Sequence, residues 1–223
     1  MRFKDFSFPS RRSPLTARNG MVATSQPLAA QAGLNVLRAG GNAIDAAVAT
    51  VATLCVVEPC STGVGGDAFA LIWSADEQRL YGINASGPAP MGLTADLVRS
   101  RGHVTFPTRG GLPVTVPGAV RGWQLALERF GTMGLDTLLA QPIEYARDGY
   151  PVSMMIAQAW RNSTELLSRL PDSQRVWLPA GRAPQMTELF RNPEFAATLQ
   201  KLAENGYDAL YVGDIAAQIA AAV

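Results

Sequence analysis

Apolar positions at helical spacing predict a first helix close to the start of the chain. Small and apolar residues recur every three to five positions over residues 27–41, and Gly40-Gly41 supplies a left-handed stop. Ser25 is the expected N-cap, with Pro27 in the first turn. The β-branched stretch at residues 20–27 predicts a short strand that leads into this helix.

A second helix is predicted directly after the first, over residues 43–57. Asn42 is its expected cap, with Asp45 three residues later in the spacing of a capping box, and Glu58-Pro59 ends it. Its residues are small on every side, so the apolar positions form no single stripe. This pattern is typical of a buried helix that lies very close to its neighbours.

A glycine-rich segment, STGVGG at residues 61–66, links the second helix to a predicted β-hairpin with strands at 67–76 and 80–87. A phosphate-binding loop has the opposite order, in which a strand precedes the glycines and a helix N-terminus follows. We therefore expect Gly63, Gly65 and Gly66 to serve conformation, with positive φ and a close approach of another backbone or a ligand.

The rest of the chain predicts further helices. An apolar face of Ala119, Trp123, Leu127 and Phe130 is typical of a core helix. The other predicted helices are a short one capped by Thr94, one in residues 134–153 broken by Pro142, one from Asn192 to Gly206, and one over residues 214–223.

Composition and charge describe a globular chain without an electrostatic case for nucleic acid or a membrane surface. The 223 residues are 48% hydrophobic and 17% charged, with a net charge of +1. No apolar stretch is long and hydrophobic enough to predict a membrane span. No secretory signal is evident at the N-terminus, so we expect a cytoplasmic protein with an extension at residues 1–19 before the main portion at 20–223.

Histidine and cysteine, which serve in many catalytic and metal sites, are scarce in this chain. The single histidine, His103, is expected on an exposed loop, and with only two cysteines no common zinc ligand set can form. We expect no metal and no cofactor. Cys55 and Cys60 are spaced so that a disulfide is open to them, but two reduced, partly buried thiols are the favoured interpretation.

Long segments of the chain resemble the N-terminal part of the γ-glutamyltransferase family. They are residues 20–73, 116–133, 146–153 and 203–220, so the resemblance runs from about Gly20 to the last residue. It implies an α+β fold, the four-layer αββα sandwich of the N-terminal-nucleophile hydrolases, to which this chain supplies part of the large subunit. It also implies a precursor that cuts itself into two subunits, and the two-subunit unit could pair further into a dimer of heterodimers.

In this family the nucleophile is the N-terminal threonine of the small subunit, whose own amine serves as base. The resemblance therefore implies that no catalytic residue lies in this chain, and that its partner is the small subunit of the same precursor. It also accounts for an enzyme with so little histidine.

The resemblance breaks at the end of the second hairpin strand. Glutamyl-specific members have an Asp-Phe-Arg-Glu type segment there, whose arginine binds the substrate α-carboxylate. This chain has residues 84–87, Asn-Ala-Ser-Gly, and Ser86 stands at the arginine position. We expect Asn84, Ser86 and Gly87 to line the substrate pocket, and Arg109 to be a candidate replacement for the arginine.

The resemblance and the serine at position 86 leave three candidate functions. The first is an amidohydrolase for a small amide such as oxamate, as in the cytoplasmic branch that includes the oxamate amidohydrolases of purine catabolism. The second is a γ-glutamyl or glutathione hydrolase or transferase with an altered carboxylate site. The third is a non-catalytic binding remnant. Glu58 and Asp67, which flank the glycine segment, are expected to be hydrogen-bonded structural carboxylates.

Overall fold

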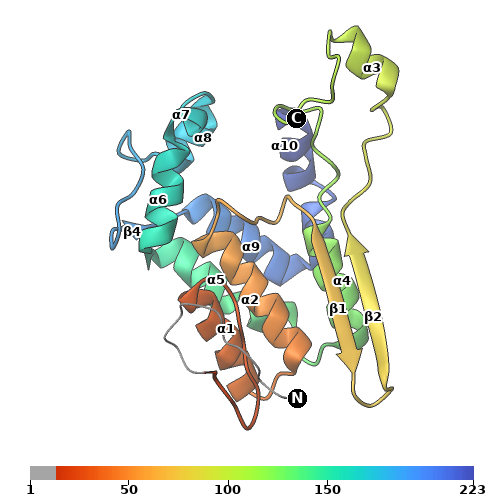
Figure 1. Cartoon of the computed structure of the whole chain (residues 1–223), viewed down its shortest axis with the longest axis vertical. Helices are drawn as coiled ribbons and strands as arrows, with labels where there is room; N and C mark the ends of the chain where they lie inside the picture. The colour runs from red at the N-terminus through yellow and green to blue at the C-terminus, as the bar shows by residue number, and fades with distance from the viewer. Residues whose placement is uncertain (1–13) are drawn as a thin grey trace.

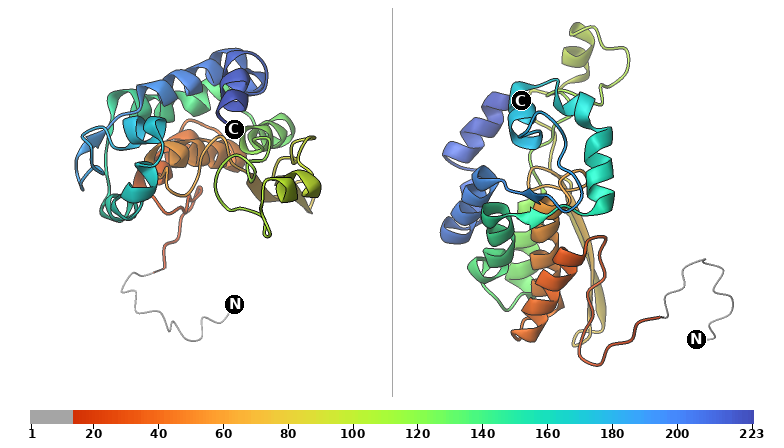
Figure 2. Two further views of the ribbon diagram at one scale, coloured as in Figure 1. Left: turned by 90° about the horizontal axis from the view of Figure 1, so that it is seen from above. Right: turned by 90° about the vertical axis from the view of Figure 1, so that its left-hand side faces the viewer.

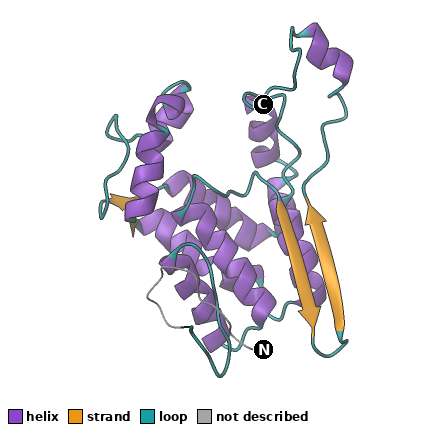
Figure 3. Cartoon of the chain, viewed as in Figure 1, coloured by secondary structure: helices purple, strands orange, loops and turns teal. Residues whose placement is uncertain are grey.

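The described part of the chain, residues 14–223 of a computed structural model, is mostly helical with two small antiparallel sheets (Figure 3). Residues 1–13 of the predicted N-terminal extension lie outside the described residues, and residues 14–19 are exposed and irregular. The N-terminal half contains α1 (Pro27–Arg38), α2 (Ala43–Val57), β1 (Ala68–Ser74), β2 (Arg79–Ala85), α3 (Ala95–Ser100) and α4 (Ala119–Phe130). The C-terminal half contains α5 (Leu135–Asp148), β3 (Tyr150–Pro151), α6 (Met154–Asn162), α7 (Thr164–Leu167), α8 (Pro171–Trp177), β4 (Leu189–Phe190), α9 (Pro193–Asn205), the 3₁₀-helix η1 (Tyr207–Leu210) and α10 (Asp214–Ala222).

Helix α2 lies at the centre of the helical core, in contact with α1, α4 and α5, while α5 also packs on α9 (Figure 1). The predicted capping box of Asn42 and Asp45 is present, and the helix is largely buried, as expected. Small residues let α1 approach closely, since a Cβ built on Gly33 would lie 2.2 Å from the Thr50 hydroxyl. The small residues of α1 and α2 therefore serve close helix packing.

The predicted hairpin is confirmed as β1 and β2, which pair antiparallel from Ala68 opposite Ala85 to Ser74 opposite Arg79. One face of the hairpin lies on α4, where a Cβ on Gly122 would come within 2.8 Å of the Ala85 Cβ. The chain thus combines helices with strands that pair antiparallel, which confirms the α+β class.

Two expectations near the N-terminus are wrong. Residues 20–26 form no strand, because within the described residues no other segment pairs with them, and Val22 packs against the helical core instead. The N-cap of α1 is Gln26, whose side chain accepts from the Leu28 and Ala29 N–H groups. Ser25 donates to Glu58 at 2.6 Å, which confirms a hydrogen-bonded role for Glu58.

The expected break at Pro142 is also wrong, because α5 continues through it. A proline inside a helix removes one backbone hydrogen bond and costs about 3 kcal/mol or more. The Pro142 ring is fully buried in the core, and packing of this ring helps to offset that cost.

The sequence did not predict the short helices α6 to α8. Strands β3 and β4 pair antiparallel and so join the two ends of the segment that contains α6 to α8. Trp160 lies 4.6 Å from Phe190, measured between ring centroids, and donates its indole N–H to the Trp177 carbonyl. An aromatic cluster therefore holds this segment against the helical core. Helix α3, in contrast, stands away from the core (Figure 2). None of the described helices has the length and apolar character required to cross a membrane.

Candidate substrate pocket at the end of β2

A pocket of about 540 Å³ opens where β2 ends. Its walls are two stretches of backbone, residues 84–88 and 116–118, together with the side chains of Arg121, Leu125 and Tyr211. Three of the four residues predicted from the sequence, Asn84, Ser86 and Gly87, line it. Pockets of this size hold small-molecule ligands in many proteins.

Two facing glycines let the walls of the pocket meet. Gly87 has a φ of +74°, and a Cβ there would lie 1.9 Å from the Val116 carbonyl oxygen. A Cβ on Gly118 would lie 2.0 Å from the Ala85 carbonyl oxygen. The Val116 N–H also donates to the Pro88 carbonyl at 3.0 Å. The end of β2 is therefore fixed against the segment that leads into α4.

The predicted polar residues adopt a compact turn. The Asn84 side chain accepts from the Ser86 N–H at 3.1 Å, as asparagine does in Asx turns. Ser86 is half-buried, and its hydroxyl makes no hydrogen bond to another described residue, so it is free to meet a ligand. Arg109 lies exposed on the preceding loop and does not line this pocket. A substrate-binding role for these four residues stays a prediction.

Arg121 is a pocket residue that the sequence analysis missed. It projects from the first turn of α4, donates to Asp208 at 2.8 Å and also donates to Gln124. Its guanidinium carbon lies 4.7 Å from the ring centroid of Tyr211, whose hydroxyl accepts from the Arg121 N–H at 3.0 Å. Among the described residues that line the pocket, Arg121 alone is charged.

One local signal could have drawn attention to Arg121. The first turn of a helix favours acidic side chains, because the helix dipole is positive there. The first turn of α4 contains no acidic residue and does contain this arginine. Burial raises the pKa of the Tyr211 hydroxyl, and the neighbouring Arg121 partly opposes this effect, so Tyr211 is neutral at pH 7.

The glycine segment positions α4 through only one of the three expected glycines, and without the expected backbone conformation. Gly63, Gly65 and Gly66 do not have positive φ, and a Cβ on Gly63 or Gly65 would meet no atom within 4 Å. The expectation of positive φ is therefore wrong. The expected close approach occurs at Gly66, whose carbonyl accepts from the N–H groups of Gly118 and Ala119 at 2.8 and 3.0 Å. This carbonyl satisfies two donors at the start of α4, which otherwise has no side-chain cap.

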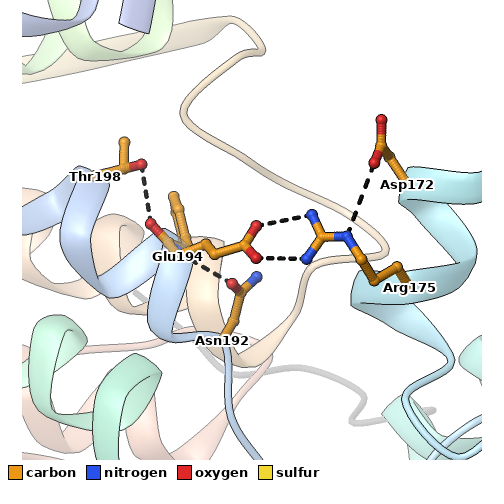
Figure 4. A network of polar contacts seen from close by, with 6 residues as sticks. Asp172, Arg175, Asn192, Glu194 and Thr198 are labelled. Atoms are coloured by element: carbon orange, nitrogen blue, oxygen red, sulfur yellow. Dashed lines mark hydrogen bonds and ion pairs between the residues drawn. The ribbon is translucent and has the colours of Figure 1, made fainter. Parts of the chain in front are cut away.

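A larger hollow of about 690 Å³ lies between the glycine segment and helices α8, α9 and α10. Glu194 on its wall forms a two-pronged ion pair with Arg175, and the Arg175 contact lowers the pKa of the Glu194 carboxyl (Figure 4). Lys201 also lines the hollow, so its charges are mixed. It contains none of the residues predicted for the site, and the pocket at β2 is the better candidate.

The remaining candidate groups lie outside the pocket at the end of β2. Cys55 and Cys60 are both free, which confirms the reduced state, although Cys55 is fully buried and Cys60 is exposed rather than both being partly buried. Asp67 is exposed and makes no hydrogen bond to another described residue, so the structural role expected for it is wrong. His103 is half-buried on its loop. The described residues hold no group of three or more histidine, cysteine or acidic side chains that could bind a metal ion.

The outer face of the hairpin is apolar and uncovered. Phe69, Leu71 and Trp73 of β1 are 65%, 79% and 58% exposed, and Leu80 of β2 lies opposite Trp73. Soluble proteins rarely leave such a contiguous apolar patch in water. This surface is therefore typical of an interface.

Comparison with known proteins gives a consistent result. The model of the family described as gamma-glutamyltranspeptidase matches residues 29–223. The glutathione hydrolase-like YwrD proenzyme of Bacillus subtilis is 38% identical over 200 residues, which cover 89% of this chain and 38% of that protein. The oxamate amidohydrolase proenzyme of Klebsiella pneumoniae is 39% identical over 208 residues, which cover 91% of this chain and 39% of that protein.

A solved structure with the same arrangement is the cephalosporin acylase from Bacillus halodurans. The acylase is 44% identical to this chain, and the TM-score is 0.90. The superposition covers 99% of this chain and 42% of the acylase chain. The chain thus spans about two fifths of the length of these relatives.

Proposed function

The chain belongs to the gamma-glutamyltranspeptidase family, and on that basis we propose that it is the N-terminal part of the large subunit of a self-cleaving amidohydrolase. The membership confirms the fold class expected from the sequence, the sandwich of the N-terminal-nucleophile hydrolases. In this proposal residues 20–223 are one portion of a single domain, and the nucleophilic threonine lies on the small subunit.

The uncovered face of the hairpin supports a partner from the same precursor. Full burial of an exposed side chain such as Phe69 or Leu71 stabilises a protein by about 1.5–3 kcal/mol. A second sheet laid on this face would gain that energy, and no other strand of residues 14–223 pairs with either edge of the two-stranded sheet. We assign this place to the small subunit.

The pocket at the end of β2 carries the substrate proposal. Its single positive charge and its small polar groups suit a small amide with one carboxylate, such as oxamate. A relative named as an oxamate amidohydrolase supports this substrate class.

A second candidate is a γ-glutamyl or glutathione hydrolase, which the glutathione hydrolase-like relative supports. A protein that binds without catalysis is the third. Location in the cytoplasm is part of the first proposal, and cell fractionation tests it.

Intact-mass measurement and N-terminal sequencing of the purified full-length protein test the enzyme proposal. We expect two polypeptides, of which the smaller begins with threonine. A single uncleaved polypeptide would leave only the non-catalytic alternative. If cleavage is found, ammonia release from oxamate supports the first candidate, and release of aniline from a γ-glutamyl anilide supports the second.

A further inference from the structure

The pocket at β2 holds an arginine with unused hydrogen-bonding capacity. An arginine side chain carries five N–H donors, and Arg121 uses two of them on Asp208 and Gln124. The Arg121 side chain is 42% exposed, so water reaches its remaining donors. Asp208 does not itself line the pocket, which leaves the pocket wall with a positive charge and no negative one.

The guanidinium is also held in place before any ligand arrives. The Tyr211 ring lies against it at 4.7 Å, and the Tyr211 hydroxyl is fixed by the Arg121 backbone N–H. An arginine that is already oriented loses little side-chain entropy when it binds an anion. Ser86, whose hydroxyl makes no hydrogen bond to another described residue, lines the same pocket.

We infer that Arg121 binds the carboxylate of the substrate in this pocket, and that it replaces the arginine expected at the position of Ser86. This inference rests on the proposed function for the identity of the substrate. Asp208 is then a counterion that the substrate carboxylate displaces or shares. Its side chain is 73% exposed, so it can turn into water at little cost.

Binding of oxalate tests the inference without any need for turnover. Oxalate resembles oxamate but has no amide bond to hydrolyse, and its affinity for the purified full-length protein can be measured by isothermal titration calorimetry. Arg121→Met should weaken oxalate binding about 10- to 100-fold, the range of a lost charge-assisted hydrogen bond. Arg121→Lys, which keeps the charge but loses the two-pronged geometry, should weaken it by less.

Asp208→Asn separates substrate binding from a purely structural ion pair. If Arg121 binds the anion, removing its competitor should leave oxalate binding unchanged or make it tighter. If the pair only stabilises the fold, Asp208→Asn and Arg121→Met should weaken binding alike, and that result would overturn the inference. Arg99→Met is the matched control, because Arg99 is an exposed arginine paired to Asp96 at 3.1 Å outside the pocket.

The outcomes also separate this inference from the proposed function. Wild-type protein that binds no oxalate, or binding that depends on Arg109 and not on Arg121, would overturn the inference. Oxalate binding that is sensitive to Arg121 in a protein that does not hydrolyse oxamate would keep the inference and reject the oxamate proposal. If the Arg121→Met protein hydrolyses oxamate with an unchanged KM, the oxamate proposal is kept and the inference about Arg121 is rejected.

Discussion

Replacing Asp45 with asparagine should destabilise the helical core strongly, because this buried carboxylate joins two segments that are far apart in the sequence. Its two oxygens accept from the Asn42 N–H at 2.8 Å, the Thr132 hydroxyl at 2.6 Å, and the N–H groups of Thr132 and Met133 at 2.9 and 3.2 Å. It thus connects the start of α2 to the turn between α4 and α5. The side chain is completely buried.

The magnitude follows from the number of donors. An asparagine has one acceptor oxygen and an amide group that only donates, so two of the four donors would face a group that cannot accept. A hydrogen bond to a charged group contributes about 1.5–3 kcal/mol, so the loss of two predicts a cost of about 3–6 kcal/mol. This is a large part of the roughly 5–15 kcal/mol by which a domain is stable.

The pH dependence of stability provides an independent test of the contribution of the Asp45 carboxylate. Burial raises the pKa of Asp45, but the hydrogen bonds from Thr132, Asn42 and Met133 together lower it below the ordinary value of 3.8. Because the folded-state pKa is lower than the unfolded one, the stabilisation is present above about pH 4 and is lost as the pH falls through the lowered pKa. Asp45→Asn should remove this part of the acid sensitivity.

Urea unfolding of the full-length protein and hydrogen exchange of peptides from residues 42–57 and 130–148 measure the effect. A loss of 3 kcal/mol should lower amide protection more than 100-fold where exchange needs this junction to open. Thr132→Val is the matched control, since it removes one donor and should cost about 1.5–3 kcal/mol. An Asp45→Asn protein within 1 kcal/mol of wild type, or no less stable than Thr132→Val, would refute the reasoning.

Two further predictions concern glycines and thiols. Gly87→Ala should cost about 2–5 kcal/mol and lower the melting temperature, since its φ is positive and the new Cβ would overlap the Val116 carbonyl, whereas Gly63→Ala should stay within about 0.5 kcal/mol of wild type. Equal losses in both would contradict this. Burial raises the pKa of Cys55 to about 12, so iodoacetamide at pH 8 should modify Cys60 and spare Cys55 until urea is added. Peptide mass mapping measures this, and equal labelling of the two native thiols would count against it.

The sequence predicted the elements whose signals are local. Asn42 with Asp45, Thr94, and Asn192 followed by Pro193 all cap the helices that they were expected to cap, and Gly206 ends α9 with a positive φ. These features act within one helical turn, so a stretch of a few residues contains all the information that they need.

Local signals failed where distant partners decide the outcome. The β-branched residues near Val22 form no strand because no other described segment pairs with them. Pro142 does not end α5, because burial of its ring helps to offset the lost hydrogen bond. Gly63 and Gly65 lie in open loop positions that do not require glycine conformations.

The sequence by itself thus determined the α+β class, the family resemblance and the hairpin end at which Asn84, Ser86 and Gly87 line a pocket. Only the tertiary structure added Arg121 and Tyr211 to that pocket, from segments that begin about 35 and 125 residues later. The physical reason is that a binding site depends on distances between side chains across the fold. Here the carbonyl of Gly66 and the close backbone contact at Gly87 place α4 beside β2, and no short stretch of sequence specifies that contact.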